Sequence, residues 1–459
     1  MAQHNIEKWD PGYALLKPYV NLNFRGYFRK IYIQGRENIP RDVPLIFAPN
    51  HQNALMDALG VLYALPGQPV FLARSDIFKH PLIARILTFL KLLPIYRIRD
   101  GYESLQRNDW ILEKVGDVLQ RKRSLVIFPE GNHSAERRLR PLKKGICRIA
   151  FQAEEKNDFN LGLQIVPVGL DYDDFYKFGH TLVVRFGRPV SVDPYQSLYQ
   201  ESSSRAYIAL KKEIADQLRQ VMIHISDRKH HDAINQLREI YRVRMEDHLN
   251  GRLTRRPDQL KADHQLVRLC EAQCAAHPEE ADRLDRQIKR YQWILNRIRL
   301  RPWVFNRRHY AWGSLLARSP LMLLFFPVFL YGLVNNALPF FLPVLPTRKV
   351  KDPQFWSSIK NGLALILFPF FYALQTIAVA AFTDDPLIPL GYLLSLPLSG
   401  YLAYWYYTGW KKWKAQWRYN LLHKKKPFVM KQILDLRNEI LSTVDRWWEQ
   451  TRNTSTGSF

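Results

Sequence analysis

The sequence predicts an α/β fold that is extended by helices and by membrane segments towards the C-terminal end. Between residues 31 and 200, short apolar runs of strand length alternate with segments of helix length. This pattern is typical of a central, mostly parallel or mixed sheet flanked by helices. The next hundred residues are helical in period and highly charged. Long uncharged apolar segments follow them.

These patterns divide the chain into regions. We predict an N-terminal surface helix over residues 1–30, an α/β domain over 31–226, an amphipathic helical module over 227–310, membrane segments over 311–414 and a basic, aromatic tail over 415–459. A chain of 459 residues has room for two or three domains. Its net charge of +25 favours an anionic partner, which is either nucleic acid or a membrane surface with acidic lipids. Three cysteines imply no disulfide framework and indicate a reducing compartment.

The N-terminal helix is predicted over residues 11–29, where aromatic and basic side chains alternate. Such a helix lies at a bilayer surface or packs against the domain that follows it. The strands of that domain are predicted at 31–33, 44–48, 70–73, 93–96, 125–128, 165–168 and 182–186, with helices at 54–65, 81–92 and 104–121 among those between them. In such sheets polar ligands collect beyond the strand ends.

The charged module contains three or four amphipathic helices, with breaks expected before Pro257 and Pro278. His264, Cys270, Cys274 and His277 are too irregularly spaced to predict a metal site. The tail after Trp410 either lies on anionic lipid or ends as a solvated segment.

The membrane segments differ from one another. Residues 319–345 are interrupted by Asn335 and Asn336, so we expect a re-entrant or surface-lying hairpin. Residues 362–382 and 387–410 are long enough to cross a bilayer, although buried core helices are the alternative. The acidic turn at 383–386 lies between two basic flanks, and the positive-inside rule therefore places both flanks and the α/β domain on the cytoplasmic face.

A histidine and an aspartate follow the strand predicted at 44–48. His51 precedes a predicted helix whose first turn contains Asp57, and Asn53 is a plausible N-cap of that helix. A histidine oriented by a carboxylate can act as a general base for a hydroxyl. The alternative is a structural loop histidine with a first-turn aspartate that suits the helix dipole.

Further polar blocks follow other predicted strands. Arg97 and Arg99 end one strand, and arginine binds phosphate through a planar fork. Glu130 and Gly131, in the run Phe-Pro-Glu-Gly, end another strand. Pro167 lies in a fourth block, Ile-Val-Pro-Val-Gly.

These four blocks, in this order, resemble the glycerol-phosphate acyltransferase superfamily, which includes the lysophosphatidate acyltransferases. The resemblance covers residues from about 30 to 200. It implies that His51 is the base and Asp57 its orienting partner, and that Arg97 binds phosphate, with Arg99 beside it. It also implies that Glu130 and Gly131 help to bind the glycerol phosphate and that Pro167 shapes the acyl-donor pocket.

Two departures from the pattern matter. Five residues rather than four separate His51 from Asp57, which resembles a branch acting on glycerol-3-phosphate and dihydroxyacetone phosphate. In addition, Asn132 and His133 stand where the superfamily has Thr and Arg, and Arg137, Arg138 or Arg140 could replace the missing arginine.

The resemblance implies a membrane-bound O-acyltransferase of phospholipid biosynthesis. It would move a fatty acyl group from acyl-CoA or acyl-carrier protein to 1-acyl-sn-glycerol-3-phosphate or glycerol-3-phosphate, without a further cofactor. The alternatives are an acyltransferase for another lipid acceptor and a catalytically inactive, lipid-binding scaffold. The membrane segments disfavour nucleic acid as the partner.

Overall fold

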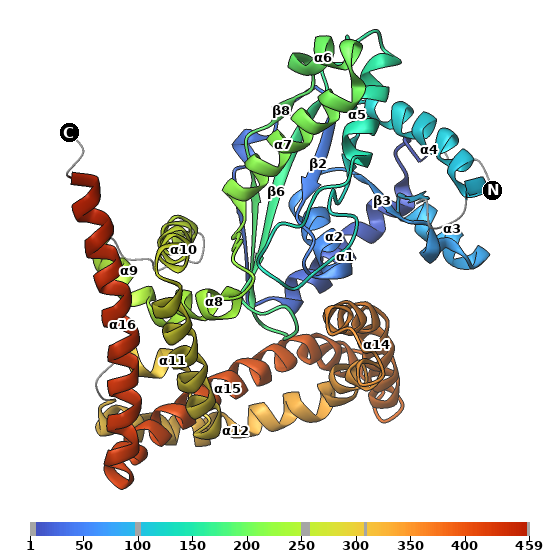
Figure 1. Ribbon diagram of the computed structural model, residues 1–459. Helices are drawn as coiled ribbons and strands as arrows, with labels where there is room; N and C mark the ends of the chain where they lie inside the picture. The colour runs from blue at the N-terminus through green and yellow to red at the C-terminus, as the bar shows by residue number, and fades with distance from the viewer. Residues whose placement is uncertain (1–5, 97–101, 249–257, 307–309, 457–459) are drawn as a thin grey trace. The chain divides into compact units, whose positions relative to one another are not determined.

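The computed structural model describes residues 6–96, 102–248, 258–306 and 310–456 (Figure 1). It separates into two compact units. The first contains Met1–His224 together with Pro346–Gly362, and the second contains Ile225–Leu345 together with Leu363–Phe459.

An eight-stranded sheet forms the centre of the first unit. Its strands are β1 (Lys30–Gln34), β2 (Leu45–Pro49), β3 (Val70–Arg74), β4 (Leu92–Ile95), β5 (Ser124–Val126), β6 (Gln164–Tyr172), β7 (Thr181–Phe186) and β8 (Val190–Ser191). The order is β1-β7-β6-β2-β5-β3-β4, with β8 beside β6. Only the β6–β7 and β6–β8 pairings are antiparallel among the described strands. The predicted mixed, mostly parallel sheet is therefore confirmed.

Helices cover both faces of this sheet (Figure 1). They are α1 (Pro11–Tyr27), α2 (Ala54–Ala64), α3 (Pro81–Phe89), α4 (Tyr102–Gln120), α5 (Gly145–Glu155), α6 (Gln196–Glu201) and α7 (Ser203–Val221). One apolar core joins α1 and α2 to the sheet through Phe24, Met56 and Val61. A second core joins α4, α5 and α7 to it through Val115, Ile149 and Leu210. This arrangement is an α/β/α sandwich.

Helix α1 packs against the sheet with part of its surface and leaves other side chains exposed. Phe24 is completely buried against the sheet, whereas Leu15 and Leu22 on the same helix are 82% and 72% exposed. The helix begins at a clear cap, because the Asp10 carboxylate accepts the backbone N–H of Tyr13 at 2.8 Å. One face of α1 therefore packs against the sheet, and the role of this helix at a bilayer surface stays a prediction.

The register of three parallel strands fixes where the polar blocks meet. Strand β2 lies between β5 and β6, and Phe47 pairs with Val126 on one side and with Val166 on the other. The carboxyl ends of these strands therefore emerge at one edge of the sheet. Asn50 extends β2 with its side chain, which donates to the Leu170 carbonyl (3.2 Å) and accepts from the Leu170 N–H (2.6 Å).

The second unit is helical in its described residues. Its charged part contains α8 (His231–Ile240), α9 (Arg242–His248), α10 (Gln259–Ala276) and α11 (Pro278–Arg297). The C-terminal helix α16 (Pro427–Thr456) packs against α10 and α11. Its buried apolar residues recur at steps of three and four along one face, as a packed helix requires: Met430, Ile433, Leu436, Ile440, Val444 and Trp447. The expectation that this region is only a solvated or lipid-bound tail was therefore wrong.

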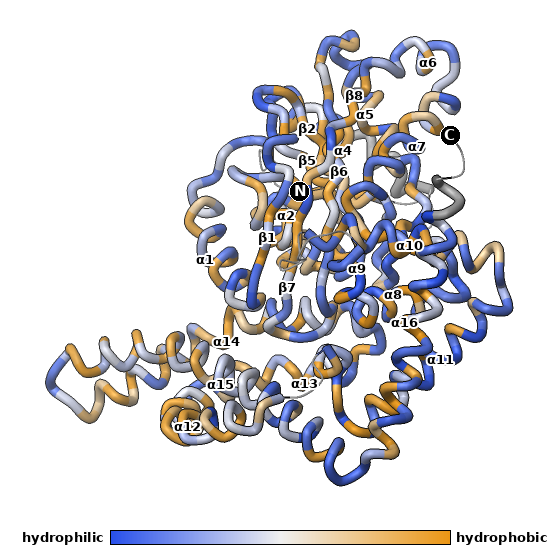
Figure 2. The backbone as a smooth tube through the Cα atoms, turned by 90° about the vertical axis from the view of Figure 1, so that its left-hand side faces the viewer, coloured by the Kyte–Doolittle hydropathy of each residue, from blue (hydrophilic) through white to orange (hydrophobic). Residues whose placement is uncertain are grey.

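Three helices are long and apolar enough to cross a membrane in the part of the chain that the structure describes. They are α12 (Trp312–Phe341), α14 (Gln354–Ala380) and α15 (Leu387–Lys425), and α13 (Val344–Thr347) is a short turn after α12. Figure 2 shows apolar residues along all three long helices.

Helix α12 is continuous where the sequence predicted an interruption. The Asn336 amide donates to the Gly332 carbonyl of its own helix (2.9 Å) and to the Leu396 carbonyl of α15 (3.2 Å). Tyr372 of α14 donates to the Asn336 side-chain oxygen (2.6 Å), and Tyr392 of α15 donates to that of Asn335. The asparagines do not break the helix, because neighbouring helices satisfy their polar groups.

Candidate functional site

The catalytic candidate His51 lies in the loop between β2 and α2. Its backbone N–H donates to Glu130 Oε1 (2.8 Å), and its carbonyl accepts the N–H of Ser134 (3.1 Å). The His51 ring lies 4.3 Å from that of Phe128, measured between centroids, and its side chain remains partly accessible. Thus the loop after β2 is tied to the loop after β5, and the imidazole is still within reach of a substrate.

Asp57 holds the imidazole. Its Oδ2 lies 2.8 Å from His51 Nδ1 and also accepts the backbone N–H groups of Gln52 (2.7 Å) and Asn53 (2.6 Å). Its Oδ1 accepts the hydroxyl of Tyr172 (2.8 Å). Because an ionised carboxylate only accepts, Nδ1 carries the proton and the Nε2 lone pair is left for another donor. Asn53 occupies the predicted N-cap position, but its side chain makes no cap hydrogen bond.

Glu130 and Gly131 form the turn after β5. The two carboxylate oxygens of Glu130 each accept one backbone N–H, from His51 and from Arg140 (3.1 Å). Burial raises the pKa of Glu130 to about 7, although both N–H donors oppose that shift. Gly131 has a positive φ of 68°, a conformation that favours glycine. The turn therefore fixes the His51 loop through backbone contacts.

Residues 346–362, which we call the return segment, come back to the first unit after α12. Asp352 Oδ2 lies 3.3 Å from Nε2 of His133, and the ring of Phe355 lies 4.8 Å from the His133 ring. The His133 ring in turn lies 5.4 Å from that of His51. Burial and the neighbouring His51 lower the pKa of His133. Sequence reasoning had not connected this segment with the site.

The other predicted site residues lie apart from this cluster or cannot be placed. Pro167 is buried in β6, paired with Ala48, and its carbonyl accepts the N–H of Gly187 (2.8 Å). Arg97 and Arg99 lie outside the described residues. Strand β4, which precedes them, runs parallel to β3.

Arg137, Arg138 and Arg140 are the candidates to replace the arginine that is missing at residue 133. Of these, Arg137 has a structural role. It is buried, pairs with Asp171 and donates to the Tyr172 carbonyl. Arg138 pairs with Glu136 (3.2 Å), and Arg140 donates to the His133 carbonyl (3.3 Å). Arg138 and Arg140 are therefore less occupied by buried contacts of the fold than Arg137.

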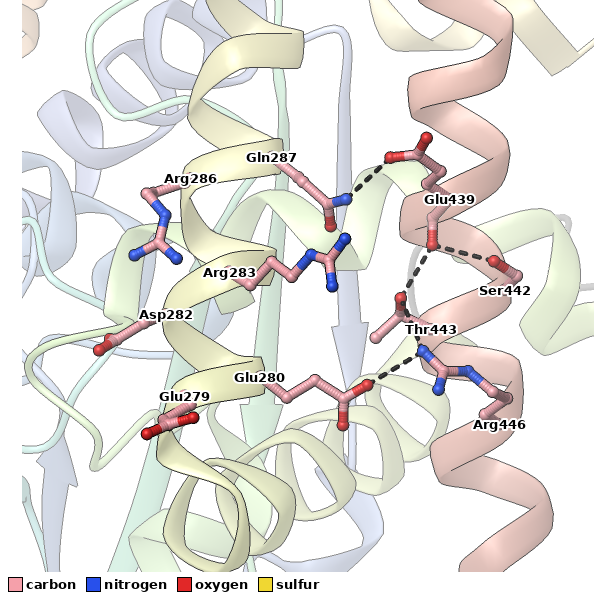
Figure 3. A pocket seen from close by; sticks show the side chains of 10 residues that line it. All are labelled: Glu279, Glu280, Asp282, Arg283, Arg286, Gln287, Glu439, Ser442, Thr443 and Arg446. Carbon is pink, nitrogen blue, oxygen red and sulfur yellow. Dashed lines mark hydrogen bonds and ion pairs between the residues drawn. The ribbon is translucent and has the colours of Figure 1, made fainter.

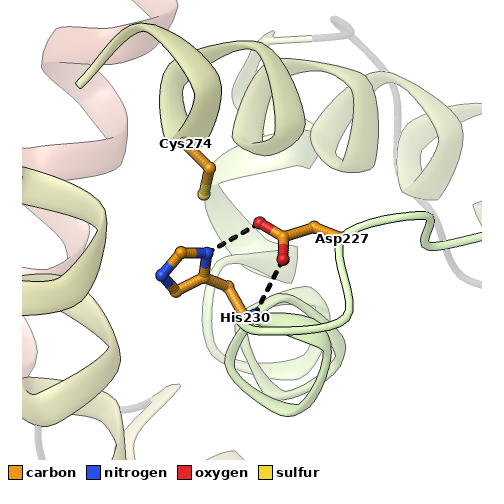
Figure 4. A group of neighbouring side chains, drawn as sticks. All are labelled: Asp227, His230 and Cys274. Atoms are coloured by element: carbon orange, nitrogen blue, oxygen red, sulfur yellow. Dashed lines mark hydrogen bonds and ion pairs between the residues drawn. The ribbon is translucent and has the colours of Figure 1, made fainter. Parts of the chain in front are cut away.

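One cluster has the chemistry of a metal site. Ligand atoms of Asp227, His230 and Cys274 lie within 4.8 Å of one another (Figure 4). However, His230 Nδ1 lies 2.7 Å from Asp227 and Nε2 lies 2.9 Å from Asp282, which Lys229 also contacts. Burial opposes protonation of His230, but the two carboxylates outweigh it and raise the pKa. His230 therefore links Asp227, in the loop before α8, to Asp282 of α11.

A groove between α11 and α16 measures about 740 Å³ (Figure 3). Glu280 contacts both Arg446 (3.0 Å) and the indole N–H of Trp447 (2.9 Å) across it. Acidic and basic side chains alternate along its walls, among them Glu279, Arg283, Arg286 and Glu439. This mixture gives no preference for an anionic or a cationic ligand.

Comparisons with known proteins agree with the position of the site. Residues 30–171 match the Acyltransferase family. The 1-acyl-sn-glycerol-3-phosphate acyltransferase BAT2 of Brassica napus is 30% identical over 146 residues, which are 31% of this chain and 38% of that protein. Glycerol-3-phosphate O-acyltransferase 2 of Saccharomyces cerevisiae is 26% identical over 219 residues, 46% and 28% of the two chains.

Among solved structures, the 1-acyl-sn-glycerophosphate acyltransferase PlsC of Thermotoga maritima is 19% identical. The match covers 44% of this chain and 78% of the chain of that structure, with a TM-score of 0.32. This chain covers less than two fifths of the two curated relatives described above. The matched residues contain β1, β2 and β5, His51, Asp57 and the Glu130–Gly131 turn. Residues 30–171 of this chain are therefore a domain of the acyltransferase family.

Proposed function

We propose that this protein is a membrane-bound O-acyltransferase of glycerolipid synthesis. It moves a fatty acyl group from acyl-CoA or acyl-carrier protein to glycerol-3-phosphate or 1-acyl-sn-glycerol-3-phosphate. The observation that carries the proposal is the 2.8 Å contact of His51 Nδ1 with the buried Asp57, which leaves Nε2 free to act as a base. The names of the relatives support the choice of acceptors.

The reaction needs only groups of the chain and the two substrates. His51 Nε2 takes the proton of the acceptor hydroxyl while the oxygen of that hydroxyl attacks the thioester carbon. The carbon–oxygen ester bond forms, the carbon–sulfur bond breaks, and His51 returns the proton to the leaving thiolate. No cofactor takes part in these steps.

Other residues position this base and the acceptor. The Glu130 carboxylate holds the loop of His51 by accepting its backbone N–H, and Gly131 supplies the left-handed turn beside it. We assign the acceptor phosphate to Arg97 and Arg99 on the sequence alone, and Arg140, which contacts the His133 carbonyl, is a further candidate. Pro167 lines the acyl-donor side in this proposal.

The catalytic domain faces the cytoplasm in this proposal. The basic flanks of α14 and α15 and the acidic turn between these helices support that orientation. Three apolar helices support attachment to a membrane.

An assay of purified protein in detergent tests the function. Labelled acyl thioester is offered in parallel to glycerol-3-phosphate, dihydroxyacetone phosphate and 1-acyl-sn-glycerol-3-phosphate, and labelled lipid is measured. The His51→Ala variant should lose about 10²–10⁴-fold in rate, the contribution of a general base. The variant of an exposed histidine in the same unit, His80→Ala, is the control. Lipid binding without any product from the unaltered protein would instead indicate an inactive scaffold.

A further inference from the structure

The return segment reaches the loop of His51 from a distant part of the sequence. The hydroxyl of Ser357 donates to the side-chain oxygen of Asn53 at 2.7 Å, across 304 residues of chain. Ser357 is 0% exposed and Asn53 is 1% exposed. This hydrogen bond is therefore shielded from water, where the loss of one partner leaves the other unsatisfied.

Asn53 lies between the two members of the His51–Asp57 pair. Its backbone N–H donates to Asp57 Oδ2 (2.6 Å), the same oxygen that faces His51 Nδ1. Its side-chain amide donates to the Phe175 carbonyl (3.0 Å). Together with Ser357, these contacts fix Asn53 on three sides. A shift of Asn53 would consequently move the carboxylate that orients the imidazole.

A second contact joins the return segment to the site. Asp352 accepts the Gln354 N–H with Oδ1 (3.0 Å), at the start of α14, and faces His133 Nε2 with Oδ2. Asp352 thus couples the beginning of this helix to the histidine that adjoins His51. Ser357 lies in the first turns of α14, and α14 continues from the return segment as an apolar helix of membrane length.

We propose that Ser357 and Asp352 are positioning residues of the acyl-transfer site, so that the site is completed by a segment outside the acyltransferase domain. The inference rests on the proposed function and adds to it a dependence on residues 346–362. Catalysis by a base requires its geometry to be held closely, and a displacement of about 1 Å can cost about 10²-fold in rate. Ser357 and Asp352 supply part of this support.

The kinetic test compares two adjacent hydroxyl groups in the full-length protein. Ser357→Ala should lower kcat about ten- to a hundredfold and leave KM for the acyl thioester nearly unchanged. Ser357→Thr, which keeps a hydroxyl, should stay closer to the unaltered protein. Ser358→Ala is the matched control, because the Ser358 hydroxyl is also buried but has no hydrogen-bond partner among the described residues. Asp352→Asn should lower kcat by a smaller factor than Ser357→Ala.

A double-mutant cycle separates positioning from a general effect on folding. If Ser357 acts through Asn53, the Asn53→Ala/Ser357→Ala double variant should lose no more kcat than Asn53→Ala alone. Independent, multiplied losses would overturn the proposal. So would a Ser357→Ala protein with the kcat of Ser358→Ala.

The placement is also tested without turnover. The Asn53→Cys/Ser357→Cys protein should form a disulfide under mild oxidation, detected by mass spectrometry of its peptides, whereas Asn53→Cys/Ser358→Cys should not. Equal or absent cross-linking would reject the placement of the return segment. Selective cross-linking in a protein whose unaltered form makes no product would support the placement while rejecting the proposed function.

Discussion

At the scale of single residues, the tautomer of His51 decides the chemistry. The Asp57 carboxylate accepts three donors besides the imidazole, from Gln52, Asn53 and Tyr172. These contacts fix the plane of the carboxylate. The proton of His51 is therefore held at Nδ1, and the basic nitrogen is presented away from Asp57.

Among the side chains that hydrogen-bond to Asp57, Tyr172 should be the most sensitive to substitution after His51. Tyr172→Phe removes the donor to Asp57 Oδ1 in a fully buried place. A hydrogen bond to a charged group contributes about 1.5–3 kcal/mol, so the variant should unfold more easily by that amount. Its kcat should also fall, because Asp57 gains freedom. Thermal unfolding and turnover measure the two effects, with the half-buried Tyr63→Phe as the control. Identical behaviour of the two variants would contradict this account.

Residue types alone indicated some of this site but not all of it. His51, Asp57 and Glu130 follow apolar strands, and their positions after strand ends were readable from the sequence. Tyr172 and His133 gave no comparable signal, because a buried tyrosine and a loop histidine have many structural uses. For Ser357 a signal existed. Ser357, Ser358 and Asn361 form a polar stripe at helical spacing where an apolar segment begins, and all three are buried.

At the scale of elements, the turn after β5 acts as a clamp on the turn after β2. Strand pairing brings the two turns to one edge, and Glu130 closes the gap between them by accepting backbone N–H groups on both sides. The clamp places a carboxylate in a buried site that disfavours its charge.

This clamp makes stability depend on pH. Because the folded protein raises the pKa of Glu130 from 4.5 to about 7, the folded state binds the proton more tightly than the unfolded state. The stabilisation is complete below pH 4.5 and is lost as the pH rises through about 7, by about 3 kcal/mol. Glu130→Gln does not titrate, so its unfolding midpoint should lack this slope between pH 5 and 8. An unchanged slope would assign the effect to other groups.

Helices α12 and α15 pack closely at small residues. A Cβ on Gly332 would lie 2.2 Å from the Ser399 carbonyl oxygen, so Gly332→Ala should force the helices apart. Overpacking of this kind costs about 1–3 kcal/mol. Gly313, on the same helix, has no heavy atom within 4 Å of such a Cβ among the described neighbours and provides the control. Thermal unfolding in detergent should be lowered by Gly332→Ala alone, and equal midpoints would argue against this packing.

The same helices show why local sequence predicted the first membrane segment only in part. The two asparagines read as a break, since a polar pair interrupts an apolar run. Their partners, Tyr372 and Tyr392, lie on other helices. Only the tertiary arrangement satisfies them, so the continuity of α12 was not readable from residues 319–345.

At the scale of the whole molecule, the path of the chain constrains its membrane topology. Before α12, the described residues contain no helix that is long and apolar enough to cross a bilayer. After α12, the return segment contacts Asn53 and His133 of the first unit. We expect α14 to cross the membrane and α15 to return, because both have basic flanks and an acidic turn joins them.

Thiol labelling tests this topology. In a Cys274→Ser background, which leaves only buried cysteines, single cysteines are introduced at the exposed residues Lys349, Asp384 and Lys412. An impermeant reagent applied to intact cells should label Asp384→Cys, because the positive-inside rule predicts that the acidic turn lies opposite the basic flanks. Lys349→Cys and Lys412→Cys should react only after permeabilisation. Labelling of Lys349→Cys in intact cells would contradict this orientation of α14.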